Sequence, residues 1–293
     1  MNARLASTRR KYWIAGLASV VLTSCFAQAT PKKEDVTVSN QAIVEAVQRG
    51  DFNAITAVPP DPLRLAEDLA HVAPQLNDQA SQIATILVGR YHGPQSTPFL
   101  IAMARSTHMQ AAVTAATKLG ELTEAPPAVE IARSVPQATN PLVRGQLYLV
   151  LGRSREGQAL TALRALLSTE QDVNARTKGT AAAARLGGDV ERAVFMQRVM
   201  RATAENAKDV YDELLYVGDV RFAKGLLPWL DRHEPVTRIG SEAEGRSARL
   251  CDLAVWTAVQ LGVKLSRTVT QLDNFDDATI HQTLVALQQL AAP

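Results

Sequence analysis

Glycines that follow an apolar residue recur along this chain at a nearly constant interval. They are found at Val88-Gly89, Leu119-Gly120, Leu151-Gly152, Leu186-Gly187, Val217-Gly218 and Leu261-Gly262, and successive glycines are 31, 32, 35, 31 and 44 residues apart. Glycine commonly ends a helix, and a fixed period of about 20 to 50 residues is typical of stacked helical repeats. The spacing constrains the fold strongly, but it assigns no activity, because a repeat array carries no chemistry of its own.

Helix starts agree with this period. Asp61-Pro62, Thr97-Pro98 and Asn140-Pro141 each place a capping side chain before a proline at the first helical position. No segment shows the alternation that is typical of a strand. We therefore expect an all-α fold, an α-solenoid of about six antiparallel helix pairs with a terminal capping helix. The expected elements are a leading helix near 39–49, pairs near 61–89, 95–120, 124–152, 156–187, 189–218 and 219–262, and a last helix near 277–290.

Apolar side chains inside these segments have helical spacing. Examples are Leu160, Leu163 and Leu167 in one segment, and Val190, Ala193, Val194 and Met200 in another. Alanine is dense on the second helix of several pairs, as at 181–184. Small side chains of this kind allow neighbouring helices to approach closely.

The first 29 residues have the pattern of an export signal. Arg4, Arg9, Arg10 and Lys11 precede an apolar run from Trp13 to Leu22, which is shorter than the roughly 20 residues that span a bilayer. Residues 1–29 are therefore predicted to be a signal peptide. Residues 30–38 would form a polar tether, and residues 39–293 a single helical repeat domain.

Two cleavage sites are consistent with this signal. Ala27-Gln28-Ala29 fits ordinary signal peptidase, whereas Leu22-Thr23-Ser24-Cys25 resembles the bacterial lipobox, in which Cys25 becomes the lipid-bearing first residue. Both predict a protein of the bacterial cell envelope. It would be either soluble in the periplasm or a lipoprotein that contacts the membrane only through Cys25.

The charge balance depends on this signal. The whole chain has 31 basic and 29 acidic residues, and removal of four basic residues with the signal leaves a net charge of −2. Nucleic-acid binding, which needs a basic surface, is therefore not expected. Cys251 would be the one cysteine of the domain, so an internal disulfide is excluded there and stability must come from apolar burial.

The sequence shows no motif that is typical of a catalytic or metal-binding site. The five histidines are far apart in the sequence and lack metal-ligand spacing: His71, His92, His108, His233 and His281. Cys251 lies among apolar residues and is expected to be buried and inert, and Trp256 to be core. Trp229 is either core or an exposed anchor. We predict no catalytic, cofactor-binding or metal-binding residue.

The segment from Asp231 to Arg246 interrupts the repeat and accounts for the long last interval. Insertions in repeat proteins often carry the binding face. Its candidate partner contacts are Arg232, His233, Glu234, Arg238 and Arg246. The alternative is a solvated connector.

Two adjacent repeats carry a recognisable pattern. Asn140-Pro141-Leu142-Val143-Arg144 precedes Leu151-Gly152, and Asp172-Val173-Asn174-Ala175-Arg176 precedes Leu186-Gly187. This resembles the HEAT repeat in its short bacterial form, also seen in phycobilin-lyase-like proteins. The resemblance implies an aspartate and arginine ladder between repeats, with Asp172, Arg144, Arg176 and Arg249 in those places. The segment from Pro235 to Ala254 likewise looks like the final repeat of exported bacterial HEAT proteins.

These observations favour a non-enzymatic envelope protein that binds another protein. It would act as a scaffold, as an adaptor for an envelope complex, or as an inhibitor such as an immunity protein against an envelope-active toxin. One alternative is a small-molecule binder or lyase-like enzyme that uses the concave groove. Another is a structural spacer tethered by lipid at Cys25.

Overall fold

The computed structural model describes residues 39–91, 93–239 and 246–291. This part of the chain is mostly helical, which confirms the all-α class. The α-helices are α1 (Asn40–Gln48), α2 (Pro62–Val72), α3 (Asp78–Gly89), α4 (Thr97–Ala104), α5 (Met109–Glu121), α6 (Ala128–Ser134), α7 (Pro141–Leu151), α8 (Ala159–Leu167), α9 (Val173–Arg185), α10 (Asp189–Met200), α11 (Ala207–Val217), α12 (Leu250–Leu261) and α13 (Asp277–Gln288). Most begin and end within a few residues of the expected positions.

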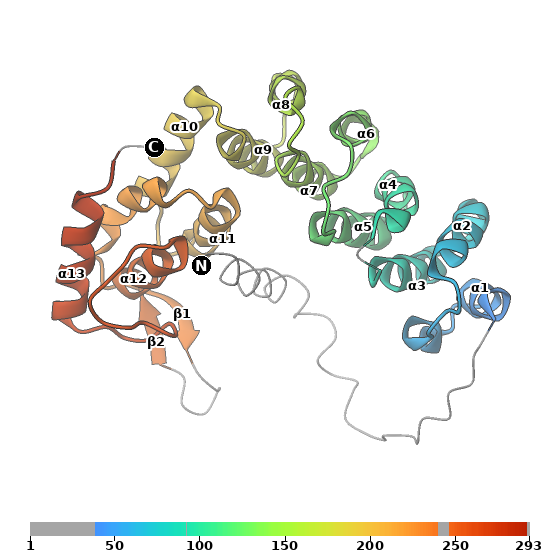
Figure 1. Cartoon of the computed structure of the whole chain (residues 1–293), viewed down its shortest axis with the longest axis horizontal. Helices are drawn as coiled ribbons and strands as arrows, with labels where there is room; N and C mark the ends of the chain where they lie inside the picture. The colour runs from blue at the N-terminus through green and yellow to red at the C-terminus, as the bar shows by residue number, and fades with distance from the viewer. Residues whose placement is uncertain (1–38, 92, 240–245, 292–293) are drawn as a thin grey trace, which may run out of the picture.

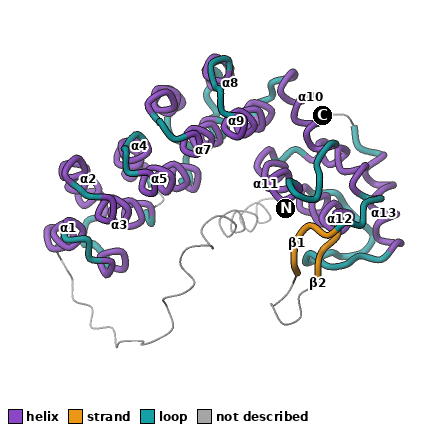
Figure 2. The backbone as a smooth tube through the Cα atoms, turned by 180° about the vertical axis from the view of Figure 1, so that it is seen from behind, coloured by secondary structure: helices purple, strands orange, loops and turns teal. Residues whose placement is uncertain are grey.

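The helices from α2 to α9 form two rows that follow an arc (Figure 1). The inner row consists of α3, α5, α7 and α9, which pack on one another in that order, and α11 then packs on α9. The outer row consists of α2, α4, α6 and α8, which also contact their neighbours in order. After α9 the helices change direction, and α10 to α13 gather at the C-terminal end with the two strands (Figure 2).

The core lies between the two rows. The outer row contributes Leu65, Leu100, Ile131 and Leu163, and the inner row contributes Ile83, Ala115, Leu147 and the alanines at 181–184, all of them buried. Burial of such side chains stabilises the fold by roughly 1.5–3 kcal/mol for each large one. Alanine at the contacts of α9 lets the neighbouring helices approach, as its density in the sequence predicts.

Two of the three predicted caps are confirmed. The Asp61 carboxylate accepts a hydrogen bond from Arg64 N at 3.1 Å, and the Asn140 side chain accepts one from Leu142 N at 2.9 Å. The prediction was wrong for Thr97, which is already the first residue of α4. The preceding Ser96 does not cap the helix either, because its hydroxyl donates to the carbonyls of Val88 and Tyr91.

The periodic glycines serve two different purposes. Gly187, Gly218 and Gly262 have positive φ angles of 92°, 69° and 103°, so they end their helices in the left-handed region as expected. Gly89 instead lies within α3, where an added Cβ would come within 2.6 Å of the Lys118 side chain. There the glycine allows the close approach of a neighbouring helix.

The last unit differs from the expected pair at 219–262. A 3₁₀-helix, η6 (Val220–Trp229), takes the place of the first α-helix, and the strands β1 (Pro235–Ile239) and β2 (Arg246–Arg249) form an antiparallel hairpin. The absence of strands was therefore wrongly predicted. Hydrogen bonds from Leu250 N to Glu234 O and from Cys251 N to Arg232 O continue the pairing to the base of the hairpin.

The two tryptophans in the described part of the chain belong to the core. Trp229 is fully buried, and its Nε1 donates to Val199 O at 2.8 Å, which decides between the two alternatives. Trp256 packs against the core and its Nε1 donates to the Tyr211 hydroxyl at 3.3 Å. Neither is an exposed anchor.

Candidate functional site

The base of the hairpin brings three of the five predicted partner contacts together. Arg232 forms an ion pair with Glu234 and donates to Ala202 O at 2.6 Å. The backbone N–H of Glu234 and the Arg232 guanidinium lower the pKa of the Glu234 carboxyl. These two side chains therefore bind each other and fix the hairpin to the end of α10. For Arg238 and Arg246 the structure describes the strand backbone, and their side chains lie outside what it describes.

His233 lies at the surface beside a buried thiol. Its Nδ1 is 3.6 Å from Cys251 Sγ and 3.2 Å from an Nη of Arg249. Cys251 is fully buried, and this burial raises the pKa of its thiol. Because the thiolate is the nucleophilic form, the contact does not make a reactive cysteine and histidine pair. The prediction of a buried Cys251 is confirmed.

Asp252, next to this thiol, is an anchor for the C-terminal segment. Its buried carboxylate accepts hydrogen bonds from the backbone N–H groups of Arg249 and Phe275 and from the Arg249 guanidinium, at 2.8 to 2.9 Å. Burial alone would raise the pKa of Asp252, but the bonds from Arg249 and Phe275 outweigh it and lower the pKa. The group joins the start of α12 to the segment before α13, which is a structural role.

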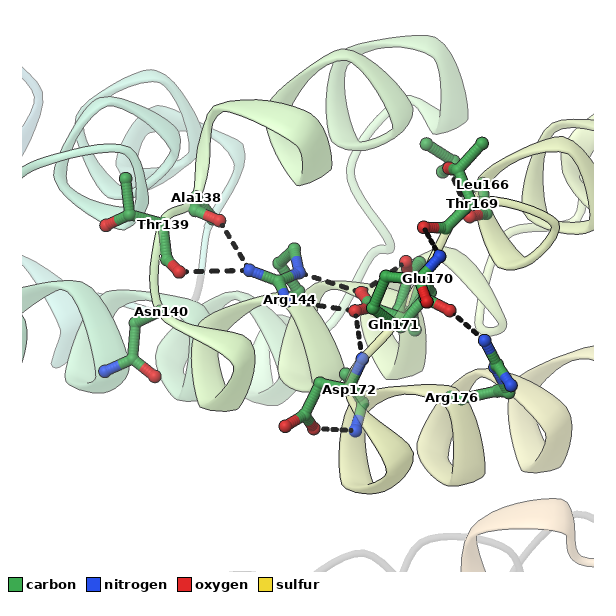
Figure 3. Close-up of polar contacts among 12 residues, drawn as sticks. Ala138, Thr139, Asn140, Arg144, Leu166, Thr169, Glu170, Gln171, Asp172 and Arg176 are labelled. Atoms are coloured by element: carbon green, nitrogen blue, oxygen red, sulfur yellow. Dashed lines mark hydrogen bonds and ion pairs between the residues drawn. The ribbon is translucent and has the colours of Figure 1, made fainter.

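A second polar cluster joins α7 to the turn before α9 (Figure 3). Arg144 on α7 donates to both carboxylate oxygens of Glu170 at 2.8 and 2.9 Å, and also to the carbonyls of Ala138 and Thr139. The Tyr148 hydroxyl and the Asp172 N–H complete the shell around Glu170. Every contact of this carboxylate is made by the chain itself.

The electrostatics of this cluster follow from that geometry. The hydrogen bonds from Arg144 hold the pKa of Glu170 at about 2, well below its ordinary 4.5. Burial and the bond to Glu170 raise the pKa of Tyr148. Such a saturated pair contributes to stability and leaves no oxygen for a ligand.

The ladder implied by the HEAT resemblance takes a different form here. Arg144 lies between repeats as the resemblance implies, but its acidic partner is Glu170 and not Asp172. Asp172 instead caps α9 by accepting from Ala175 N at 2.8 Å. Arg176 donates to Glu170 O, and Arg249 pairs with Asp252. Glu170 was not singled out from the sequence, because a single glutamate before a helix cap has no periodic signal.

The inner row also presents an extended surface, which we call the inner surface. It is formed by helical positions turned away from the buried side of each helix. These are uncharged polar and aliphatic residues: Gln79, Gln82, Ile86, Gln110, Thr114, Thr117, Leu142, Gln146, Leu149, Val173, Asn174 and Thr177. Among them Val173 is 73% and Leu142 53% exposed. A low content of charged side chains is typical of the centre of protein-binding surfaces.

Contacts between neighbouring helices hold the inner row in place. Gln82 on α3 donates to the Thr114 hydroxyl on α5 at 3.1 Å. Arg153, which follows α7, donates to the carbonyls of Gly120 and Leu122 at the end of α5. Arg185, at the end of α9, donates to Tyr216 O. Cations at helix carboxyl ends also interact favourably with the helix dipole.

The exposed side of α10 was not found from the sequence. Val190 is 69%, Val194 52% and Met200 47% exposed, although their spacing correctly predicts a helix. Helical spacing identifies an apolar side of a helix and does not say whether another helix covers it. An open hollow lined by Asp189, Arg192, Ala193 and Met196 lies beside these residues.

In the described part of the chain, no His, Cys, Asp and Glu side chains gather in a way that could hold a metal ion. No helix in these described ranges has the length and apolarity to cross a membrane. His92 and Cys25, with the whole signal and tether, lie outside the described residues.

Comparisons with known proteins add no assignment. No family model, curated protein or solved structure matches the chain.

Proposed function

We propose that this protein is an exported α-solenoid of HEAT-like repeats that binds another protein along its inner surface. The signal at residues 1–29 supports a place in the bacterial envelope, soluble or anchored by lipid at Cys25. The contacts along the two rows support the solenoid, because each helix packs mainly on its nearest neighbours. Binding would rely on shape and on many small contacts.

One observation carries the proposal: four successive helices that pack on one another in order each present aliphatic and neutral polar side chains that are exposed or half-buried. The charged pair at its edge, Lys118 and Glu121, is neutralised internally at 2.7 Å. Surfaces with exposed aliphatic groups such as Leu142 and Val173 lose little on desolvation, which favours association with a complementary protein.

The inner surface is equally consistent with three more specific roles: a scaffold, an adaptor and an inhibitor. A small-molecule binder or lyase-like enzyme is the second candidate, since an arc of helices has a concave side. It would require convergent polar groups in an enclosed site. A lipid-tethered spacer at Cys25 is the third candidate.

The test is capture of the partner from intact cells with an affinity-tagged protein, chemical crosslinking and mass spectrometry. Val173→Glu changes the inner surface, and Val129→Glu is its matched control, since Val129 is 44% exposed on α6 of the outer row. We expect an enriched protein that Val173→Glu loses and Val129→Glu keeps. Equal capture by both variants would contradict binding at the inner surface, and no capture by the wild type would favour the alternatives.

A further inference from the structure

The exposed side of α10 is a separate surface, away from the inner row. The helix has 12 residues and is therefore roughly 18 Å long. Its buried side, with Phe195 and Val199, packs on α9 and η6. The opposite side, which we call the α10 face, carries the exposed residues Val190, Ala193, Val194, Gln197 and Met200, whereas Met196 packs against η6 beside Gly225.

The two ends of the α10 face carry opposite charges. Asp189 is the first residue of the helix, and Arg201 is its C-cap; both are exposed. Within the described ranges neither side chain forms an ion pair, although Asp189 is close enough to Arg164 to raise the pKa of that guanidinium slightly. Arg192, by contrast, is used internally, since it lies 3.7 Å from Asp219 and donates to Ala184 O.

This arrangement is self-complementary under a two-fold axis. If two α10 helices pack antiparallel about the level of Phe195, Asp189 of each copy lies opposite Arg201 of the other. In the same register Val190 lies opposite Met200, and Ala193 lies opposite Gln197. A symmetric dimer requires that one patch complement itself in this way, and antiparallel helix dipoles also attract.

We infer that the α10 face is a homodimer contact, and that its occupant is α10 of a second copy of this chain. The face of one short helix is smaller than the roughly 800 Å² per partner of stable complexes. The dimer is therefore reversible and depends on concentration. Unlike the inner surface, which binds a different protein, this contact brings two arcs together.

Sedimentation velocity over a wide range of protein concentration tests the inference. The full chain carries Cys25→Ser, so that an attached lipid cannot cause association. We expect a monomer and dimer equilibrium that Val194→Glu weakens by roughly tenfold or more, because two carboxylates would be desolvated at the contact. Val129→Glu on α6 controls for added charge, and it leaves the dimer unchanged.

Charge reversal distinguishes a specific homodimer contact from non-specific apolar association. Asp189→Arg and Arg201→Asp each place like charges opposite each other and weaken the dimer. The double variant restores the dimer, because each new charge again meets its opposite. Circular dichroism confirms that each variant is folded. A wild-type monomer at every concentration, or a double variant as weak as the single ones, would overturn the inference and leave the α10 face to a different protein.

Discussion

Arg144 and Glu170 form a bidentate ion pair, with N–O distances of 2.8 and 2.9 Å. The pair joins α7 to the turn before α9. The Glu170 side chain is only 2% exposed, so solvent screens this pair very little. Since Tyr148 and the Asp172 N–H also donate to Glu170, removal of this carboxylate leaves several donors without their acceptor. Removal of Arg144 leaves a buried carboxylate without its charged partner.

This pair predicts how stability depends on pH. The pKa of Glu170 is about 2 in the folded chain, against an ordinary value of 4.5. A lowered pKa contributes stability that is fully present above pH 4.5 and is lost as the pH falls toward 2. The shift corresponds to on the order of 3 kcal/mol. Thermal unfolding followed from pH 7 to 3 should show a drop below pH 4.5 that is much smaller in Glu170→Gln.

The same variant should be destabilised at pH 7 by about 2–4 kcal/mol, because the half-buried Arg144 guanidinium loses its charged partner and keeps only the carbonyls of Ala138 and Thr139. Glu191→Gln is the matched control, since Glu191 pairs with Arg164, whose side chain is 48% exposed. A much smaller loss is expected there. Equal losses in the urea-unfolding free energies of the two variants would contradict the special role of Glu170.

At Gly152, the C-cap of α7, the helices α9 and α11 come close to the backbone. An added Cβ would overlap the Tyr216 hydroxyl and would lie 2.7 Å from Ala182 Cβ. The Tyr216 hydroxyl donates to Leu149 O at 2.7 Å. Gly152→Ala should therefore lower the free energy of unfolding by about 1–3 kcal/mol. Gly157→Ala is the control, because nothing lies within 4 Å of its Cβ position. Equal shifts of the unfolding curves of Gly152→Ala and Gly157→Ala would contradict the close contact at Gly152.

Cys251 should react slowly with thiol reagents in the folded protein. Its side chain is fully buried and this burial raises its pKa, so both access and thiolate population are low. In a Cys25→Ser background, we expect labelling at pH 8 to be far slower than in urea and unaffected by His233→Ala. Fast labelling of the native protein that is lost in His233→Ala would indicate an activated thiol.

The sequence predicts regular helices better than it predicts their surroundings. Asp61 and Asn140 cap their helices as predicted, because capping depends on residues only a few positions apart. The hairpin was missed because Pro235–Ile239 and Arg246–Arg249 are too short for a strand pattern, and their pairing joins residues separated in the sequence. The pairing of Arg144 with Glu170 is likewise long-range, across 26 residues.

The apolar spacing of α10 shows the same limit. Val190 and Val194 predict a helix in the same way as Leu160 and Leu163, yet Leu163 is fully buried and Val190 is 69% exposed. The difference arises because α8 stands in a row with α6, whereas α10 follows the change in direction after α9. Local pattern fixes the helix, and the arrangement of neighbours decides which side is exposed.

The predicted signal peptide can be tested at the N-terminus of the mature protein. Mass spectrometry of the N-terminus of the protein from its native envelope should find a chain that begins at Thr30 or at a lipid-bearing Cys25. A chain that keeps Met1 would contradict the predicted signal peptide at residues 1–29.

The central claim, that the inner surface binds a protein, is tested most directly by site-specific photo-crosslinking in living cells. A photoreactive residue at position 146 on α7 probes the inner surface, and one at position 129 on α6 probes the outer row. Our account predicts a discrete adduct with one protein from position 146 and none from position 129. No adduct from position 146, or the same adducts from both positions, would contradict it.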